Sequence, residues 1–211
     1  MNKELIKRIL SSIIILPIVF YAIIEGSFYF ILLIISCLLV AIYEWLKMIN
    51  NFYIKISGIL FLILSFYTIY QFRFIFNNNY YPFLIILLIS IFTDVGGFLF
   101  GKLFKGPKLI KISPNKTYAG VIGGYTFSLI FLIIYLSYIL KEINISIEYF
   151  IITILLSTMS QIGDIFISFF KRQSNIKNTG KIIPGHGGLL DRIDGMIFTV
   201  PLYFLIKLIG F

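Results

Sequence analysis

Four aspartates are the residues of this chain best suited to bind a cation. Asp94 and Asp164 lie inside long apolar segments, seven or eight residues before a lysine, and Asp191 and Asp194 are three residues apart. A carboxylate inside an apolar segment is costly unless it faces water, a cation or a partner. Paired carboxylates on one helix face suit Mg²⁺, which takes oxygen ligands and leaves positions for phosphate. We therefore predict a cation site, although an acid paired with a lysine for packing is the alternative.

Two basic segments, 101–117 and 171–190, have the composition of phosphate-binding loops. The first contains five lysines and leads into a predicted helix, whose free N–H groups and dipole attract anions. The second contains a glycine-rich stretch that lets the backbone approach a ligand closely. Its only histidine, His186, is flanked by glycines and has little core to pack into, which favours a functional role. The alternative is a topology signal or a contact with lipid headgroups.

The composition identifies the setting in which these residues act. Of the 211 residues, 59% are hydrophobic and only 13% are charged, and the mean hydropathy is +0.99. Soluble domains carry about 25% charged residues. A soluble enzyme, a disordered chain and a nucleic-acid-binding domain are therefore excluded, and we expect an integral membrane protein in a lipid bilayer with no nucleic-acid partner. A single cysteine, Cys37, rules out an intrachain disulfide.

Seven apolar segments are candidates for membrane-spanning helices, because a helix needs about 20 residues to cross the hydrocarbon layer. They are continuously apolar and lack the alternation of a transmembrane barrel. We predict an all-α polytopic membrane protein of about seven transmembrane helices, with residues 1–211 forming a single transmembrane domain. The segments are 9–24, 28–46, 56–70, 83–100, 118–140, 149–170 and 191–209.

The distribution of positive charge predicts the orientation. Fifteen of the 18 Lys and Arg residues lie before the first segment, after the second, after the fourth or around the loop before the seventh. Only Arg73, Lys141 and Lys207 fall on the opposite side. The positive-inside rule then places the N-terminus and both basic loops in the cytoplasm, with the active site at the cytoplasmic face.

Motifs in the second half of the chain resemble the signature of the phosphatidate cytidylyltransferase (CDP-diacylglycerol synthase) family. The most specific is the string at 184–194, Pro-Gly-His-Gly-Gly-Leu-Leu-Asp-Arg-Ile-Asp, preceded by Ser168, Lys171-Arg172 and Lys177. Shorter matches are Asp94-Val-Gly-Gly-Phe with Gly101-Lys102, Ser113-Pro-Asn-Lys-Thr117, Gly163-Asp164 and, on an early helix, Tyr43-Glu44-Trp45. The chain departs from the usual pattern with Ile167 for Glu, Asn178 for Asp, Gly97-Phe98 for Ala-Tyr and Tyr118 for Trp.

This resemblance implies an enzyme of phospholipid biosynthesis in a bacterial inner (plasma) membrane. It would transfer the cytidylyl group of CTP to phosphatidic acid, giving CDP-diacylglycerol and pyrophosphate, with a catalytic part at about 83–200. It implies Mg²⁺ on Asp164, Asp191 and Asp194, K⁺ as a second metal, and a homodimer. The catalytic residues would be Asp164, Asp191, Asp194, Lys171 and Arg192. The substrate-binding residues would be Ser113, Lys116, Thr117, Ser168, Arg172, Lys177, His186, Gly187, Gly188 and Asp94.

Two other functions are compatible with acids inside the membrane. A CDP-alcohol phosphotransferase would show an Asp-Gly…Ala-Arg…Gly…Asp…Asp pattern in one helix pair, and the segment from Asp191 to Gly195 does not extend into that pattern. A cation transporter would carry polar groups through its full depth, with a site near the midplane. In this chain the acids gather on one side only, so the cytidylyltransferase is the favoured hypothesis.

Overall fold

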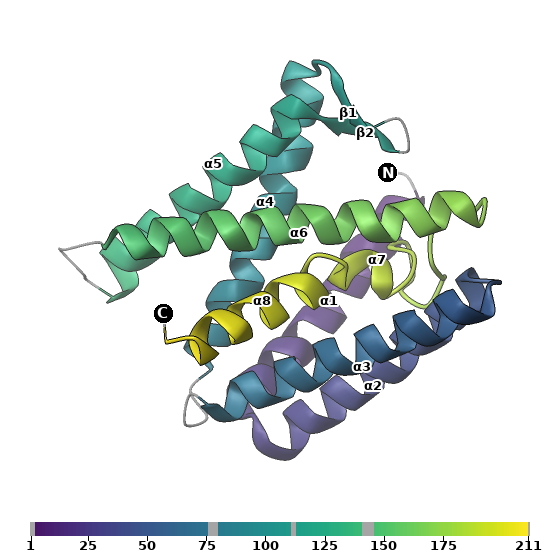
Figure 1. The fold of residues 1–211 in the computed structure, drawn as a ribbon, viewed down its shortest axis with the longest axis horizontal. Helices are drawn as coiled ribbons and strands as arrows, with labels where there is room; N and C mark the ends of the chain where they lie inside the picture. Colours follow the sequence, from purple (N-terminus) through teal and green to yellow (C-terminus); the bar gives the residue numbers. More distant parts are fainter. Residues whose placement is uncertain (1–2, 76–79, 111–112, 141–145, 211) are drawn as a thin grey trace.

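The computed structural model describes residues 3–75, 80–110, 113–140 and 146–210, and most of them are helical (Figure 1). The elements are α1 (Lys3–Glu25), α2 (Ser27–Met48), α3 (Phe52–Ile75), α4 (Tyr81–Phe104), β1 (Lys108–Ile110), β2 (Ser113–Thr117), α5 (Tyr118–Ile134), the π-helix η1 (Tyr135–Leu140), α6 (Ile147–Gln173), α7 (Leu190–Ile193) and α8 (Met196–Leu208).

The helices confirm an all-α polytopic membrane protein. Among the described residues, five helices are long and apolar enough to cross a membrane, and they correspond to α2, α3, α4, α5 with η1, and α6. The first predicted segment lies in α1, where the apolar stretch among the described residues is Leu10–Glu25, and the last contains the shorter apolar helix Met196–Leu208. The 13 residues of α8 extend only about 20 Å, less than the hydrocarbon layer of about 30 Å. The last segment differs from its prediction because α7 forms a separate short turn before α8.

Short polar side chains cap the N-termini of several of these helices. They accept hydrogen bonds from backbone N–H groups that lack a partner within the helix. The Asn51 side chain accepts from Tyr53 N (3.0 Å) at the start of α3. Thr117 Oγ1 accepts from Gly120 N (3.1 Å) at the start of α5. Thr117, predicted to bind substrate, therefore positions the helix that follows the basic loop.

The basic loop 101–117 contains a small β-hairpin that the sequence did not predict. β1 and β2 pair antiparallel, with Lys108 opposite Thr117 and Ile110 opposite Ser113. The segment lacks a clear alternation of polar and apolar residues, so its pattern gave no strand signal. The hairpin lies at the joined ends of α4 and α5 (Figure 1) and contacts α6 through β2.

α4 and α5 form the most extensive helix–helix contact in the described part of the chain, and glycines line it. A Cβ at Gly96 would overlap the carbonyl oxygen of Gly123, and a Cβ at Gly123 would overlap Phe100. Gly120 contributes to the same contact, since a Cβ there would lie 2.9 Å from the Gly97 carbonyl oxygen. The α4–α5 pair thus forms one rigid unit that carries the hairpin.

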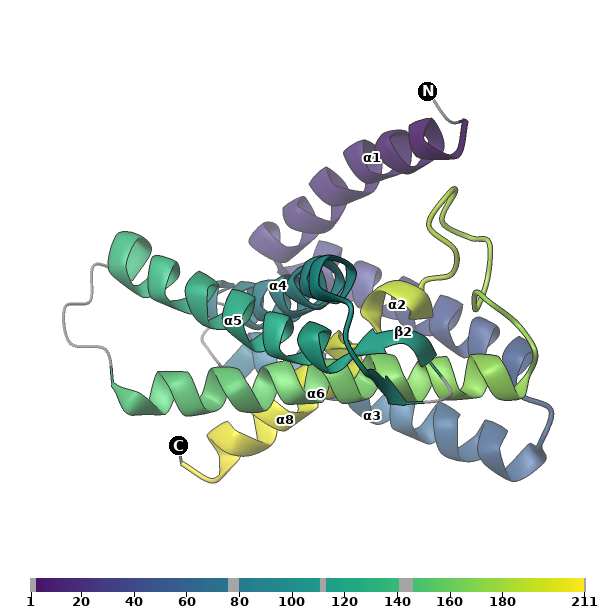
Figure 2. The same ribbon diagram turned by 90° about the horizontal axis from the view of Figure 1, so that it is seen from above.

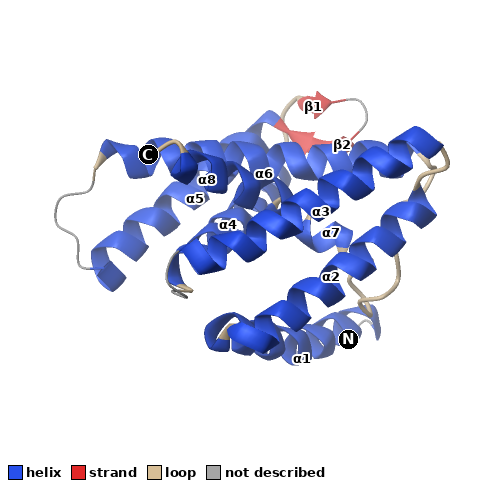
Figure 3. Cartoon of the chain, turned by 60° about the horizontal axis from the view of Figure 1, so that its bottom comes forward, coloured by secondary structure: helices blue, strands red, loops and turns tan. Residues whose placement is uncertain are grey.

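Hydroxyl pairs and apolar side chains join the other helices to this unit. Ser90 on α4 lies 2.7 Å from Ser160 on α6, and Thr93 donates to Ser157 (2.9 Å). α6 packs on α8, and α3 contacts both α2 and α8. α1 lies at the edge of the bundle, with α2 as its main neighbour (Figures 2 and 3).

Candidate active site

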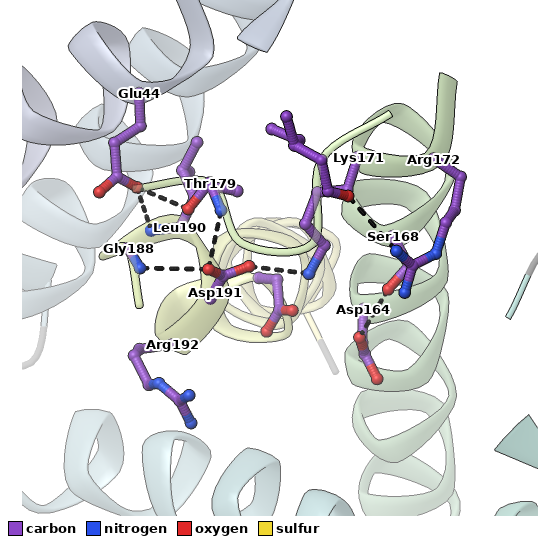
Figure 4. Close-up of polar contacts among 12 residues, drawn as sticks. Glu44, Asp164, Ser168, Lys171, Arg172, Thr179, Gly188, Leu190, Asp191 and Arg192 are labelled. Atoms are coloured by element: carbon purple, nitrogen blue, oxygen red, sulfur yellow. Dashed lines mark hydrogen bonds and ion pairs between the residues drawn. The ribbon is translucent and has the colours of Figure 1, made fainter. Parts of the chain in front are cut away.

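Asp191 on α7 connects three parts of the chain at the end of α6 (Figure 4). Its Oδ1 accepts from Lys171 Nζ (2.7 Å), in the last turn of α6. Its Oδ2 accepts from the backbone N–H groups of Thr179 (2.9 Å) and Gly188 (3.1 Å). The Asp191 side chain is only 7% exposed. The structure thus brings Lys171 and Asp191, two of the residues predicted to be catalytic, into contact, and the carboxylate also fixes the loop between them.

Glu44 is a buried acid to which the sequence reasoning assigned no role. It comes from α2 and is 1% exposed. Its carboxylate accepts from the Thr179 hydroxyl (2.8 Å), Leu189 N (2.9 Å) and Leu190 N (2.9 Å). A sequence signal for it was present, because Glu44 is the only acid in the second predicted span and belongs to the Tyr43-Glu44-Trp45 motif.

Lys116 and Asp164 form a second ion pair. Lys116 Nζ on β2 lies 2.7 Å from Asp164 Oδ2 on α6, and both side chains are partly exposed. Ser168, one turn further along α6, donates to Asp164 Oδ1 (3.3 Å). The hairpin thus brings the predicted Lys116, Asp164 and Ser168 together.

The aspartates on α4, α6 and the α7–α8 junction lie close enough to interact electrostatically. Asp194 experiences the negative charges of both Asp164 and Asp94. It is 6% exposed, and one of its oxygens accepts from Gly195 N (2.9 Å). Three of the four aspartates predicted to converge, Asp94, Asp164 and Asp194, therefore lie near one another, with the charges of Lys116, Lys171 and Arg192 nearby.

The predicted set of three metal ligands is not assembled as a cluster. Within the ranges that the structure describes, no group of three or more His, Cys, Asp and Glu side chains could hold a metal ion. Asp191 faces Lys171, and Asp164 faces Lys116. The oxygen-rich chemistry suits Mg²⁺, but the arrangement pairs these carboxylates with lysines.

The glycine-rich stretch forms a tight turn that presents His186 to α1. Ile183 and Gly187 form an isolated antiparallel bridge, and Gly187 has a φ of 94°, a conformation that favours glycine. The His186 ring lies 3.0 Å from Ser11 Oγ and 3.4 Å from Ser12 Oγ. The predicted residues His186, Gly187 and Gly188 are therefore adjacent, and the turn is attached to the wall formed by α1.

The remaining predicted residues lie at different places in the fold, and only Arg192 contacts this turn through a hydrogen bond among those described. Arg192 Nη2 donates to the His186 carbonyl oxygen (2.6 Å), and Arg172 Nη1 donates to that of Ile176 (3.3 Å). Lys177 is exposed. Ser113 lies in β2, but its side chain is outside the part that the structure describes.

A cavity of about 310 Å³ opens beside these groups. Most of its wall is apolar and comes from residues such as Val19 on α1, Phe30 on α2 and Phe66 on α3. Asp94, His186 and Arg192 also line it. The cavity therefore combines an apolar wall with charged and polar groups from the site.

Comparison with known proteins places the chain in a family. The family model described as the cytidylyltransferase family matches residues 6–79 and 59–209, which together cover most of the chain. The chain belongs to the cytidylyltransferase family. Membership in the cytidylyltransferase family agrees with the motif resemblance, and neither the cation transporter nor the CDP-alcohol phosphotransferase gains support.

Curated cytidylyltransferase relatives carry the name phosphatidate cytidylyltransferase. The relative from Rickettsia felis is 36% identical over an alignment of 221 residues, which covers 99% of this chain and 94% of that protein. The relative from Staphylococcus haemolyticus is 45% identical over 123 residues, covering 58% of this chain. That match spans only 45% of the staphylococcal protein, so the chain matches about half of the length of this relative.

Two departures from the usual cytidylyltransferase pattern occupy different environments. Ile167 is 2% exposed and belongs to the apolar core. Its position on the buried side of α6 suits an apolar residue. Asn178 is exposed and precedes Thr179. A charge at position 178 would therefore be accessible to solvent, whereas a charge at position 167 would be buried.

Proposed function

We propose that this protein transfers the cytidylyl group of CTP to phosphatidic acid, releasing pyrophosphate. A phosphate oxygen of phosphatidic acid attacks the α-phosphorus of CTP, and the bond to the β-phosphate oxygen breaks. The products are CDP-diacylglycerol and pyrophosphate. The nucleophile is already anionic, so the reaction requires alignment and charge neutralisation more than a general base.

The cavity is the observation that carries this proposal. Its apolar wall suits an acyl chain, and Asp94, His186 and Arg192 mark the part where a charged headgroup would lie. A lipid substrate could thus keep its tails among apolar side chains while its phosphate meets the basic residues of the two loops. A water-soluble substrate would gain nothing from the apolar wall.

The basic residues have distinct proposed tasks. Lys116 and Lys171 are held on the edge of the site by Asp164 and Asp191, where their charge can offset that of the phosphates. Arg192, fixed by the His186 carbonyl, lies at the cavity wall and can bind the headgroup. Arg172 and Lys177, nearer to solvent, suit the triphosphate of the incoming nucleotide.

Mg²⁺ remains part of the proposal. It would supply Lewis-acid neutralisation of phosphate charge, and the acids proposed to hold it are Asp164, Asp191 and Asp194. K⁺ as a second ion, a homodimer, seven membrane spans and cytoplasmic loops in a bacterial inner membrane belong to the same proposal. Activity measured with and without a chelator tests the Mg²⁺ requirement.

The decisive experiment incubates membranes containing the protein with labelled CTP, phosphatidic acid and Mg²⁺, followed by lipid extraction. We expect labelled CDP-diacylglycerol above the amount made by membranes without the protein. The absence of such product would refute the proposed function.

A matched pair of variants tests the cavity. Val19 lines the cavity, whereas the adjacent Ile18 is 59% exposed on the outer face of α1. Val19→Phe should raise KM for long-chain phosphatidic acid by about tenfold or more, because the larger ring fills space that an acyl chain needs. Ile18→Phe should leave KM within about twofold of wild type. If the two substitutions change KM equally, the cavity is not part of the lipid-binding site.

A further inference from the structure

We propose that Glu44 is a positioning residue for this reaction, acting on Asp191 through Thr179. The inference rests on the proposed cytidylyl transfer. Glu44 lies on α2, in the N-terminal part of the chain, whereas the groups that it holds belong to the loop after α6 and to α7.

The Glu44 carboxylate is satisfied by donors from this loop and helix. It is 1% exposed, and in the described part of the chain no Lys, Arg or His forms an ion pair with it. A buried charge is costly unless it is paired or hydrogen-bonded. Three donors meet this need, the Thr179 hydroxyl and the N–H groups of Leu189 and Leu190. The carboxylate therefore stays buried only while the loop and the start of α7 are in place.

Thr179 transmits this constraint to Asp191. Its hydroxyl donates to Glu44 Oε2 (2.8 Å), while its backbone N–H donates to Asp191 Oδ2 (2.9 Å) (Figure 4). Glu44 also binds the N–H of Leu190, the residue next to Asp191. Glu44 thus positions the Asp191 carboxylate through both Thr179 and Leu190. The other carboxylate oxygen of Asp191 accepts from Lys171 Nζ.

The local sequence leaves space for this contact. A Cβ at Gly180 or at Gly188 would overlap the Glu44 carboxylate, so side chains at these positions would push the loop away. The neighbouring Trp45 is 3% exposed and packs edge-on against Phe170, with ring centroids 5.0 Å apart. Trp45 therefore fixes α2 against the end of α6, at the level where Glu44 meets the loop.

Substitutions at Thr179 separate positioning from general stability. Thr179→Val removes the hydroxyl but keeps the shape, whereas Thr179→Ser keeps the hydroxyl. Thr68→Val is the matched control, because Thr68 is similarly buried (6% exposed, against 4% for Thr179) and its hydroxyl donates within α3, to the Ser65 carbonyl (2.7 Å). We expect Thr179→Val to lower kcat by about tenfold or more, while KM for phosphatidic acid stays within about twofold. Thr179→Ser and Thr68→Val should keep kcat within about twofold.

Limited trypsin digestion of the full-length protein in detergent gives a readout that needs no activity. Lys177 and Lys181 are exposed cleavage sites within the loop that Glu44 holds. Glu44→Gln places an amide NH₂ group against donors and should accelerate cleavage there by about threefold or more, because local opening becomes easier. Thr68→Val should leave the cleavage rate unchanged.

The outcomes distinguish the two proposals. If the wild-type protein is active, and Thr179→Val leaves both kcat and cleavage as in Thr68→Val, the positioning role is refuted and cytidylyl transfer stands. If Thr179→Val lowers kcat as strongly as expected but Thr179→Ser does so too, the hydroxyl contact is not the cause and the inference fails. If the wild-type protein makes no product while Glu44→Gln accelerates cleavage, the reaction and the positioning role both fall, and Glu44 remains an anchor of the loop.

Discussion

At the scale of single residues, the acids of this site differ in the partners that they have. Asp191 has a lysine and two N–H groups, Asp164 has a lysine and a hydroxyl, and Glu44 has neutral donors only. The type of partner determines what each substitution should do. Removing a charge that has a buried lysine leaves that lysine unpaired, whereas removing an exposed charge does little.

Asp191→Asn should abolish most of the activity and also destabilise the protein. Its side chain and that of Lys171 are 7% and 12% exposed, and breaking a buried pair costs about 3–5 kcal/mol. We expect kcat to fall by about tenfold or more, equivalent to about 1.4 kcal/mol in the barrier. The double variant Lys171→Met/Asp191→Asn should regain thermal stability without regaining activity. CDP-diacylglycerol formation and the Tm in detergent measure the two effects, and recovery of activity in the double variant would make the pair purely structural.

Asn178→Asp should have only a small effect. The position is exposed, and a charge in such a place contributes about 0–1 kcal/mol. We expect kcat/KM to change by less than about tenfold. A steady-state comparison at fixed ionic strength measures it, and an increase of about a hundredfold would instead identify position 178 as catalytic.

At the scale of elements, the α4–α5 pair determines where the hairpin lies. The hairpin is short, and its strands pair only with each other. The close helix contact below it therefore places Lys116 over α6. Loosening that contact should move Lys116 away from Asp164, although no residue of the ion pair is changed.

Two adjacent glycines test this dependence. A Cβ at Gly96 would overlap the Gly123 carbonyl, whereas a Cβ at Gly97 would lie 3.5 Å from the Gly120 carbonyl oxygen, an ordinary van der Waals contact. Gly96→Ala should lower both Tm and activity, because the helices must separate. Gly97→Ala should be neutral or stabilising by up to about 1 kcal/mol, since alanine favours the helix. If thermal unfolding shows the same decrease in Tm for both variants, the close α4–α5 contact does not have this role.

At the scale of the whole molecule, the elements that form the site end on one side. Figure 1 shows the N-terminus, the α2–α3 connection and the C-terminal end of α6 toward the same side, with the C-terminus at the other. These are regions to which the charge distribution assigns the cytoplasm. The geometry and the charge distribution are therefore compatible with one orientation.

A labelling experiment tests that orientation. Cysteine is introduced at Lys108 or Asn178 in a Cys37→Ala background, and intact cells are compared with inside-out vesicles. Both positions should react with a membrane-impermeant thiol reagent only from the cytoplasmic side. Reaction at either position from the outside would reverse the orientation and move the site with it.

The sequence predicted local features better than long-range contacts. The seven apolar segments are largely helical, although the last is divided into α7 and α8, because continuous apolar runs specify helices in a membrane. Asp164 and Asp191 were identified as acids that need partners, but which lysine each would meet was not predictable. The contact of Glu44 with Thr179 joins residues 135 positions apart, and no periodicity encodes such a pairing. The hairpin was missed because its pairing depends on the helices below it.

The distance along the chain between Glu44 and its donors has a consequence for biosynthesis. The ribosome makes Glu44 early, and Thr179, Leu189 and Leu190 leave the ribosome only after α3, α4, α5, η1 and α6 have been made. During this interval the carboxylate has none of its final donors. Glu44 is four residues from the end of α2 at Met48, about 6 Å along the axis, so the nascent chain can keep it hydrated at the membrane surface. Mature packing at this acid is therefore a late event, completed when the last part of the chain folds back onto the first.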